Sequence, residues 1–294
     1  MEKYVINEEF LQQLETLETI LHNNVSGMFG GNRKSKRFGS SPEFADYRDY
    51  IPGDDMTKID WNAYARFDKL YLKLFLDERQ MHTRIYIDAS RSMEFGQGKK
   101  GEVALKLAAA LAYISVCEMD KVSIYALKDK AVYEVAVGMV GKDSFYNNIG
   151  KLNGIVFEGD SFISEAIIPS TVGYGDGLSV IISDFLTEND FDSAIDYLTD
   201  KRRDILCIQL LTPEELNPQI RGKSHLFDSE DERKFFRKNI TRDIIAAYKR
   251  ATEYVRERIR SLCESHGATY IFSTTDRTVS DILFGSLTDM GVIK

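Results

Sequence analysis

Three polar residues, Asp88, Ser90 and Ser92, stand at alternate positions directly after a short apolar run. In an extended loop, alternate side chains project to the same side, so one carboxylate and two hydroxyl groups converge on a common point. Carboxylate and hydroxyl oxygens are hard donors, which suit Mg²⁺ or Mn²⁺ better than zinc or copper. Because few of these ligands are charged, such a metal keeps several water molecules and an open coordination position.

Two further oxygen donors stand where the same site could use them. Ser161 follows Gly159 and Asp160 at the start of a helical segment, and Asp184 follows the apolar run 178–183. Serine and aspartate also favour helix caps and turns, which is the plain structural alternative for all of these residues. The metal-site hypothesis assigns the ligands Asp88, Ser90, Ser92, Ser161 and Asp184.

The elements around these residues alternate between short apolar strands and helical segments. We expect strands over 84–88, 122–127, 132–137, 178–183, 205–211 and 268–273, and helices over 102–118, 190–199, 240–266 and 280–290. This alternation predicts an α/β fold with a mostly parallel sheet covered by helices on both faces. In such sheets functional loops lie beyond the carboxyl ends of the strands, where Asp88 and Asp184 fall.

Residues 1–80 do not follow this alternation of strands and helices. Apolar residues recur at helical spacing over 10–21, and a strand is expected over 70–76. Between them lies a glycine-rich stretch that carries the basic cluster Arg33, Lys34, Lys36 and Arg37, typical of a solvated loop. We therefore expect an N-terminal extension over residues 1–80, packed on a main domain over residues 81–294.

Composition and charge narrow the class of protein. Hydrophobic residues make up 43% and charged residues 29% of the 294 residues, which is ordinary for a globular chain. The net charge of −8 argues against a nucleic-acid partner, since phosphate binding needs a basic face. The longest apolar helical run contains Lys106 and is too short to span a membrane. Three widely spaced cysteines predict reduced thiols and, with an N-terminus unlike a signal peptide, a cytoplasmic protein.

Three segments together resemble the metal-ion-dependent adhesion site of von Willebrand factor A domains. They are Asp88-x-Ser90-x-Ser92, Gly159-Asp-Ser161-x-x-x-x-Ala166 and Ile182-Ser-Asp184. The resemblance implies a von Willebrand A-like fold in which Ser90 and Ser92 bind the metal directly, and Ser161 directly or through water. Asp88 and Asp184 would act mostly through water, and a partner's carboxylate would fill the vacant position. The family's second loop usually reads Gly-Gly-Thr, so Asp160 and Ser161 depart from it: Ser161 keeps the hydroxyl, and Asp160 adds a charge.

A longer match involves the N-terminal region. Residues 43–55 (EFADYRDYIPGDD), residues 59–66 (IDWNAYAR) and Glu78-Arg79 closely resemble the family catalogued as "domain of unknown function 58". The resemblance continues through the metal loops and covers residues 25 to 290. It implies a partnership with a MoxR-type AAA+ ATPase, because relatives are commonly encoded beside one. Larger relatives carry transmembrane helices, whereas none is expected here.

The polar residues of this N-terminal motif allow two interpretations. Arg48, Asp54, Asp55, Asp60, Trp61 and Arg66 could form a recognition surface or a network that pins the region to the sheet. We favour the network, because polar residues in a turn-rich segment usually satisfy backbone groups and charges.

The function that these residues favour is a metal-dependent protein-interaction module, whose open metal position takes an acidic residue of its partner. We expect no enzyme activity, because no nucleophile–base pair is evident. The alternative is a metal-dependent phosphohydrolase, since aspartates at two strand ends also suit phosphoryl transfer. Haloacid dehalogenase-like phosphatases carry a second carboxylate two residues after the first, where this chain has Ser90. The glycines from Gly96 to Gly101 lack the spacing of a nucleotide-binding P-loop.

Overall fold

The computed structural model divides the chain into two compact units. The larger unit combines residues 1–25 with residues 81–294, and residues 26–80 form the smaller unit. The residues that the structure describes are 5–24, 44–75, 80–94, 99–175, 177–187, 189–220, 222–227 and 235–289. The basic cluster Arg33–Arg37 lies outside the described residues.

Six strands form one mixed sheet in the larger unit. They are β3 (His82–Asp88), β4 (Lys121–Lys128), β5 (Ala131–Met139), β6 (Leu178–Ser183), β7 (Asp204–Leu211) and β10 (Thr269–Thr274). Their order is β10-β7-β6-β3-β4-β5, and only β4 and β5 pair in the antiparallel direction. Because the first of these strands, β3, lies inside the sheet, the chain winds first to one side and then to the other. The switch point of this doubly wound sheet lies between β3 and β6.

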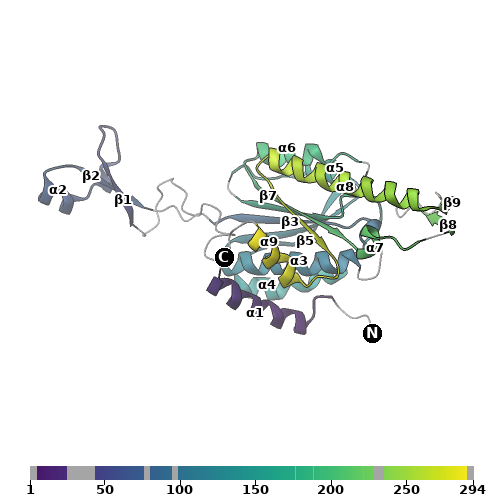
Figure 1. Cartoon of the computed structure of the whole chain (residues 1–294). Coiled ribbons are helices and arrows are strands. Elements are labelled where there is room, and N and C mark those ends of the chain that lie inside the picture. The colour runs from purple at the N-terminus through teal and green to yellow at the C-terminus, as the bar shows by residue number, and fades with distance from the viewer. Residues whose placement is uncertain are drawn as a thin grey trace. The chain divides into compact units, whose positions relative to one another are not determined.

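Helices cover both faces of the sheet (Figure 1). On one face lie α1 (Glu8–Asn24), α3 (Lys100–Cys117), α4 (Gly141–Ile149) and α9 (Val279–Asp289). On the other lie α5 (Ile163–Ile167), α6 (Asp192–Asp200) and α8 (Arg242–Ser265). Short elements complete the unit: η2 (Arg91–Glu94), η3 (Gly150–Gly154), α7 (Pro213–Leu216) and the antiparallel hairpin of β8 (Gly222–Phe227) and β9 (Phe235–Ile240). The predicted α/β fold, with a mostly parallel sheet covered by helices on both faces, is confirmed.

Helix α3 is the centre of the core on its face. Its run of alanines and leucines is apolar all round, and nearly every residue from Ala104 to Val116 is buried. A helix of this kind is stable only when it is covered on several sides. It contacts β3, β4, β6 and β7 of the sheet as well as α1, α4 and α9. Because these contacts hold α3 on several sides, the position of its first turn, at Lys100, is fixed relative to the strands.

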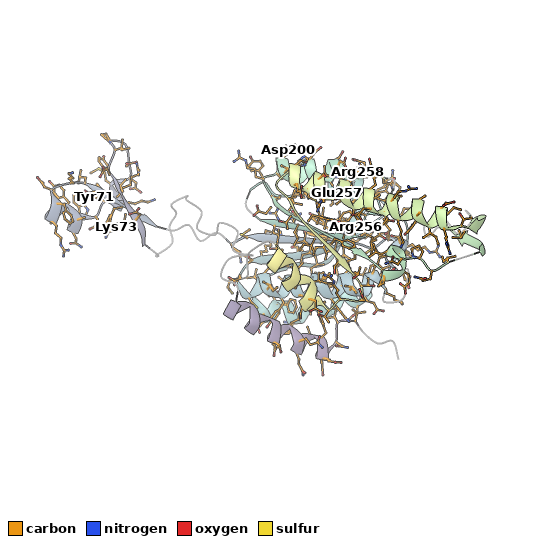
Figure 2. The ribbon with its side chains drawn as sticks, in the orientation of Figure 1. Tyr71, Lys73, Asp200, Arg256, Glu257 and Arg258 are labelled. Carbon is orange, nitrogen blue, oxygen red and sulfur yellow. The ribbon has the colours of Figure 1, made fainter. Side chains whose placement is uncertain are left out.

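Helix α8 lies on the opposite face and is amphipathic. Ile259 and Cys263 are buried, while Glu257 and Arg258 are exposed on its outer side (Figure 2). The guanidinium of Arg256 lies 3.7 Å from the ring centroid of Phe272 on β10, and Arg258 pairs with Asp192 of α6 at 3.0 Å. Of all the helices in the described ranges, none has the length and apolar character that a membrane crossing requires.

The strands and long helices lie close to the ranges expected from the sequence, with two differences. The helix expected over 240–266 begins at Arg242, because Ile240 ends strand β9 and the Thr241 hydroxyl accepts a hydrogen bond from the Ile244 amide. Helix α4 was not expected, since only two of its nine residues, Phe145 and Ile149, are buried and its pattern is weak.

The structure groups the first helix with the main domain. Ile6, Phe10 and Leu14 are buried there, and the Ile6 amide donates to Asn153 Oδ1 at 2.9 Å while Asn153 Nδ2 donates back to the Ile6 carbonyl at 3.0 Å. Residues 1–25 therefore belong to the larger unit, which resumes at Met81. The packing of residues 26–80 on the main domain stays a prediction.

The smaller unit pairs β1 (Phe44–Asp49) with β2 (Tyr71–Phe75), and η1 (Met56–Lys58) and α2 (Trp61–Phe67) lie between them in the chain. Asp60 caps α2, accepts the Tyr47 hydroxyl at 2.7 Å and lies 3.4 Å from the Lys73 ammonium on β2 (Figure 2). The hydrogen bond from Tyr47 is the largest of the contacts that lower the pKa of Asp60 to about 2. The acidic residues of the motif therefore satisfy local groups inside this unit, whereas the Trp61 side chain is exposed.

We predict that Phe145→Ala destabilises the chain by about 3–5 kcal/mol, the usual cost of removing a buried aromatic ring. The Phe145 ring is fully buried and lies edge-on to Tyr113 at 5.2 Å. Urea denaturation measures the free energy of unfolding. Tyr133→Ala, at a side chain that is 52% exposed, is the control and should change it by less than about 1 kcal/mol. Equal losses in the two variants would contradict this description of the core.

Candidate functional site

Asp88 ends strand β3 at the switch point of the sheet, and its side chain is fully buried. Ile87 pairs with Ile182 in the neighbouring strand β6, so the next residues along, Asp88 and Ser183, are also neighbours. The Ser183 hydroxyl donates to Asp88 Oδ2 at 2.6 Å. The parallel register of these two strands therefore fixes the carboxylate.

The residues after Asp88 turn tightly around its carboxylate. The Ser90 amide donates to Asp88 Oδ1 at 3.0 Å, and the Ser90 and Ser92 hydroxyl oxygens lie 3.1 Å apart. Both serines are buried. The sequence suggested an extended loop, but Ser92 lies in the helical turn η2, and the Met93 amide donates to the Ser90 carbonyl. The hydroxyls meet because the chain curls, and the expectation of alternating side chains is wrong here.

The second loop brings Ser161 to the same carboxylate. The Ser161 hydroxyl donates to Asp88 Oδ2 at 2.8 Å and is buried. Asp129 at the end of β4 holds this loop, since its Oδ1 accepts the Asp160 amide and its own amide donates to the Asp160 carbonyl. Gly159 has φ +80°, and a Cβ there would lie 2.5 Å from Asp129 Oδ1. The loop therefore requires glycine at this position.

Asp184 follows β6 and is also buried, but its surroundings differ from those of Asp88. Its Oδ1 accepts the Leu186 amide at 3.0 Å, and its Oδ2 accepts the Lys100 ammonium at 2.7 Å. Lys100 is 1% exposed and also pairs with Glu215 of α7. One of the two buried aspartates thus has a cation from the chain itself.

The structure brings all five predicted ligands to one end of the sheet. Neither capping alternative applies, because the N-cap residues of α5 and α6 are Phe162 and Phe191, and neither helix has a side-chain capping hydrogen bond. Ser161 instead bonds to Asp88, and Asp184 bonds to the turn that follows it and to Lys100. The binding of a metal by Asp88, Ser90, Ser92, Ser161 and Asp184 stays a prediction.

The electrostatics of Asp88 suit a cation. Its described donors are serine hydroxyls and a backbone amide, and none of these donors is charged. Burial, followed by the negative charge of Asp184, raises the pKa of Asp88 above its usual range. A divalent ion would supply the positive charge that this carboxylate lacks, and the neighbouring hydroxyls are the hard oxygen donors that Mg²⁺ and Mn²⁺ accept. Within the described ranges no three His, Cys, Asp or Glu side chains gather as a metal-binding group.

Three residues of this site were not assigned from the sequence: Ser183, Lys100 and Glu215. Ser183 could have been found, because it precedes Asp184 at the end of a buried strand. Glu215 also left a signal, the capping box that it forms with Thr212 at the start of α7. Lys100 left none, since a lysine at the start of a helix after a glycine-rich stretch is usually solvated.

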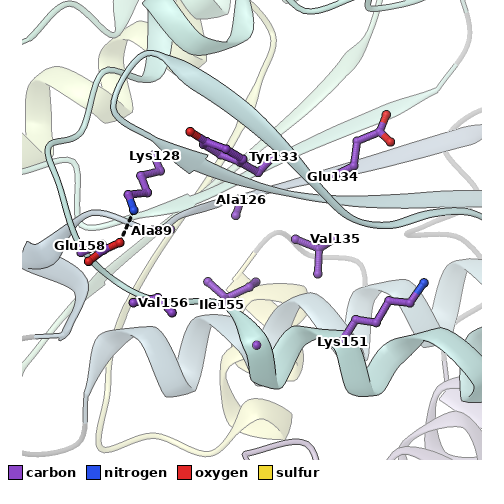
Figure 3. Close-up of a pocket in the computed structure, with 11 residues that line it drawn as sticks. Ala89, Ala126, Lys128, Tyr133, Glu134, Val135, Lys151, Ile155, Val156 and Glu158 are labelled. Carbon is purple, nitrogen blue, oxygen red and sulfur yellow. Dashed lines mark hydrogen bonds and ion pairs between the residues drawn. The ribbon is translucent and has the colours of Figure 1, made fainter.

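A cavity of about 440 Å³ adjoins the first loop (Figure 3). Its floor is apolar and includes Ala89, which stands between Asp88 and Ser90, together with Ala126 and Val135. The ion pair of Lys128 and Glu158 lies at one end, and Val156, 63% exposed, forms part of its wall. A ligand bound at the loop could therefore place an apolar group beside it.

We predict that Asp88→Asn stabilises the metal-free protein at neutral pH. Because the folded pKa of Asp88 is raised, the folded state holds this proton to a higher pH than the unfolded chain. The free energy of unfolding therefore falls as pH rises from about 4 through the raised pKa, and is level above it. The amide removes that loss and should raise the melting temperature by a few degrees, equivalent to about 1 kcal/mol.

Thermal denaturation in a chelator between pH 5 and 8 measures this effect. Asp276→Asn, at an exposed position, is the matched control and should leave the melting temperature unchanged. If the Asp88→Asn protein is less stable than wild type at pH 7, the ionised carboxylate stabilises the folded state and the prediction is wrong.

The chain is similar to several known proteins. An uncharacterized protein of Mycobacterium tuberculosis is 24% identical over 225 residues, which cover 74% of this chain and 70% of that protein. An aerotolerance-related membrane protein from Bacteroides fragilis has a TM-score of 0.42 at 15% identity, covering 72% of this chain and 98% of the other. The SpRpn10 VWA domain has a TM-score of 0.39 at 9% identity, covering 70% and 94%. The family described as "Protein of unknown function DUF58" matches residues 46–258, most of the chain, and the protein belongs to this family.

Proposed function

We propose that this protein is a metal-dependent protein-interaction module. Asp88, Ser90, Ser92 and Ser161 would hold Mg²⁺ or Mn²⁺, with Asp184 beside them. The observation that carries the proposal is the Asp88 carboxylate, which is fully buried and whose donors among the described residues are all uncharged, with the hydroxyls of Ser161 and Ser183 on its Oδ2. A buried charge without a counter-charge is costly, so a cation is the natural complement.

The residues of the site prepare it for a ligand that brings its own negative charge. When bound, the metal supplies a positive centre that accepts an oxygen from outside the chain. The Ser161 and Ser183 hydroxyls orient the Asp88 carboxylate, and the turn at Ser90 and Ser92 holds their hydroxyls 3.1 Å apart. The matching ligand is an acidic side chain of a partner protein. We propose a MoxR-type AAA+ ATPase, or one of its protein clients, as that partner.

The cavity beside the first loop extends this contact surface. Its apolar floor at Ala89, Ala126 and Val135 suits an apolar side chain that follows the acidic residue in the partner's sequence. The exposed Val156 lies on the wall of the cavity, and the paired Lys128 and Glu158 mark its end.

An enzyme is the other candidate, and we propose that the chain is not one. Ser90 stands two residues after Asp88, where a phosphohydrolase of the haloacid dehalogenase type carries an acid–base carboxylate. The described neighbours of Asp88 orient it by hydrogen bonds and include no second carboxylate bonded to it. Mg²⁺-dependent hydrolysis of a generic phosphoester, lost in Asp88→Asn, would favour the enzyme instead.

We predict that Asp88→Asn weakens Mg²⁺ binding at least about 100-fold, because it removes the charge that would hold the ion. Calorimetric titration of Mg²⁺ into metal-free protein measures the affinity, with Asp276→Asn as the charge-matched control. The same variant should lose Mg²⁺-dependent capture of a MoxR-type ATPase from the same organism. Normal capture by folded Asp88→Asn protein would sink the proposal.

We predict that Val156→Asp weakens partner binding at least about tenfold without changing Mg²⁺ affinity. The new carboxylate replaces an apolar contact and repels an acidic ligand, effects that together exceed about 1.4 kcal/mol. Tyr174→Asp is the control, since Tyr174 is 67% exposed and precedes β6, at the opposite end of the strands. Equal capture by the Val156 and Tyr174 variants would remove the cavity from the interface.

A further inference from the structure

Lys100 occupies a position that is unfavourable for a lysine in two respects. Its side chain is 1% exposed, and a buried ammonium loses the hydration that stabilises it. It is also the first residue of the 18-residue helix α3, whose aligned backbone amides make the amino end positive. An apolar residue would avoid both costs, so the charge at this position calls for an explanation.

The explanation lies in its two partners. The Lys100 ammonium bonds to Asp184 Oδ2 at 2.7 Å and to Glu215 Oε1 at 2.5 Å. These two carboxylates outweigh the loss of hydration and raise the pKa of Lys100. Lys100 therefore stays charged and links the end of β6 to the start of α7.

Both partners are held in place from their other side. Asp184 Oδ1 accepts the Leu186 amide, and the Asp184 carbonyl accepts the Gln209 side chain at 2.7 Å. Glu215 Oε2 accepts the Thr212 amide at 2.7 Å within the capping box. The link is thus built from fixed groups, and Asp184 cannot turn toward another cation without breaking its bond to Lys100.

The two aspartates of the site are therefore unequal. Asp184 has a permanent cation at hydrogen-bonding distance, whereas the described donors to Asp88 are uncharged. The Lys100 ammonium pairs with Asp184 and Glu215 but not with Asp88, so the three carboxylates together keep a net negative charge that one divalent ion can balance. Asp184 would be a second strong protein ligand for that ion, but its carboxylate is already bonded to the Lys100 ammonium.

We propose that Lys100 sets the metal affinity of this site by withholding the Asp184 carboxylate from the ion. The inference rests on the proposed function. The metal is held by Asp88 and the serine hydroxyls alone, so its affinity is low and its open position remains strongly attractive to a carboxylate from a partner. Lys100 is a positioning residue, and it acts on the metal through Asp184.

The test is calorimetric titration of Mn²⁺ into the full metal-free chain. In Lys100→Gln/Glu215→Gln the Asp184 carboxylate loses its cation, and the second change prevents an unpaired charge at Glu215. We expect Mn²⁺ to bind about tenfold more tightly than to wild type, the lower end of what a neighbouring charge does to a carboxylate's proton affinity. The matched control is Lys99→Gln, which removes the same charge one residue earlier at a side chain that is 53% exposed. It should leave the affinity within about twofold.

Equal or weaker Mn²⁺ binding by the folded double variant would overturn the inference. Asp184→Asn gives a second measurement that does not depend on removing Lys100. Because Asp184 is withheld in the wild type, its amide should change the Mn²⁺ affinity by less than about threefold, and a loss beyond about tenfold would overturn the inference as well.

The same titrations separate this inference from the proposed function. If Mn²⁺ binds and Asp88→Asn abolishes the binding, but the Lys100 variant equals wild type, only the role of Lys100 is wrong. If Mn²⁺ binds neither wild type nor the double variant, the metal-dependent function fails, and the role of Lys100 fails with it.

Discussion

Hydrogen bonds from uncharged groups hold the Asp88 carboxylate out of water at the place where β3 meets β6. Such bonds orient an anion but do not neutralise it, and desolvation makes the remaining charge expensive. The loops around it are arranged for this one group: Ser90 and Ser183 approach from neighbouring strand ends, and Ser161 arrives on a loop that Asp129 and Gly159 hold. Among the described residues, neutral donors therefore orient the Asp88 carboxylate without neutralising its charge.

The sheet topology explains why this charge can be tolerated at all. At the switch point the helices that follow β3 and β6 leave on different faces, so the ends of the two strands are not covered by one continuous connection. The residues just before these strand ends, 85–87 and 180–182, are hydrophobic, and polar residues follow them directly. Stability is therefore supplied by the body of the sheet and by α3, while the loops beyond the strand ends carry the polar residues of the candidate site.

Sequence patterns were sufficient where the physical signal is local. Continuous apolar runs identified the strands, and the change to polar residues at Asp88 and Asp184 located the site, because parallel strands end at one edge. The pairing of Lys100 with Glu215 spans 115 residues, and nothing near either residue indicates the other. The curl of η2 was missed for a different reason: Asp-Ala-Ser-Arg-Ser permits both extended and helical backbone, and the hydrogen bonds to a buried carboxylate decide between them.

The first helix belongs to a unit that is completed only after the intervening residues 26–80 have been traversed. During synthesis α1 leaves the ribosome before the rest of its unit, with Phe10 and Leu14 bare, and Asn153, the hydrogen-bond partner of Ile6, follows Ile6 by 147 residues. Closing so long a loop costs little more than closing a shorter one, since each doubling adds only about 0.6 kcal/mol. The delay matters more than this entropy cost, because the exposed apolar face of an unpacked amphipathic helix can bind chaperones or other nascent chains. Because residues 26–80 must be synthesised in between, the smaller unit lengthens the interval between the synthesis of α1 and its packing on the rest of the larger unit.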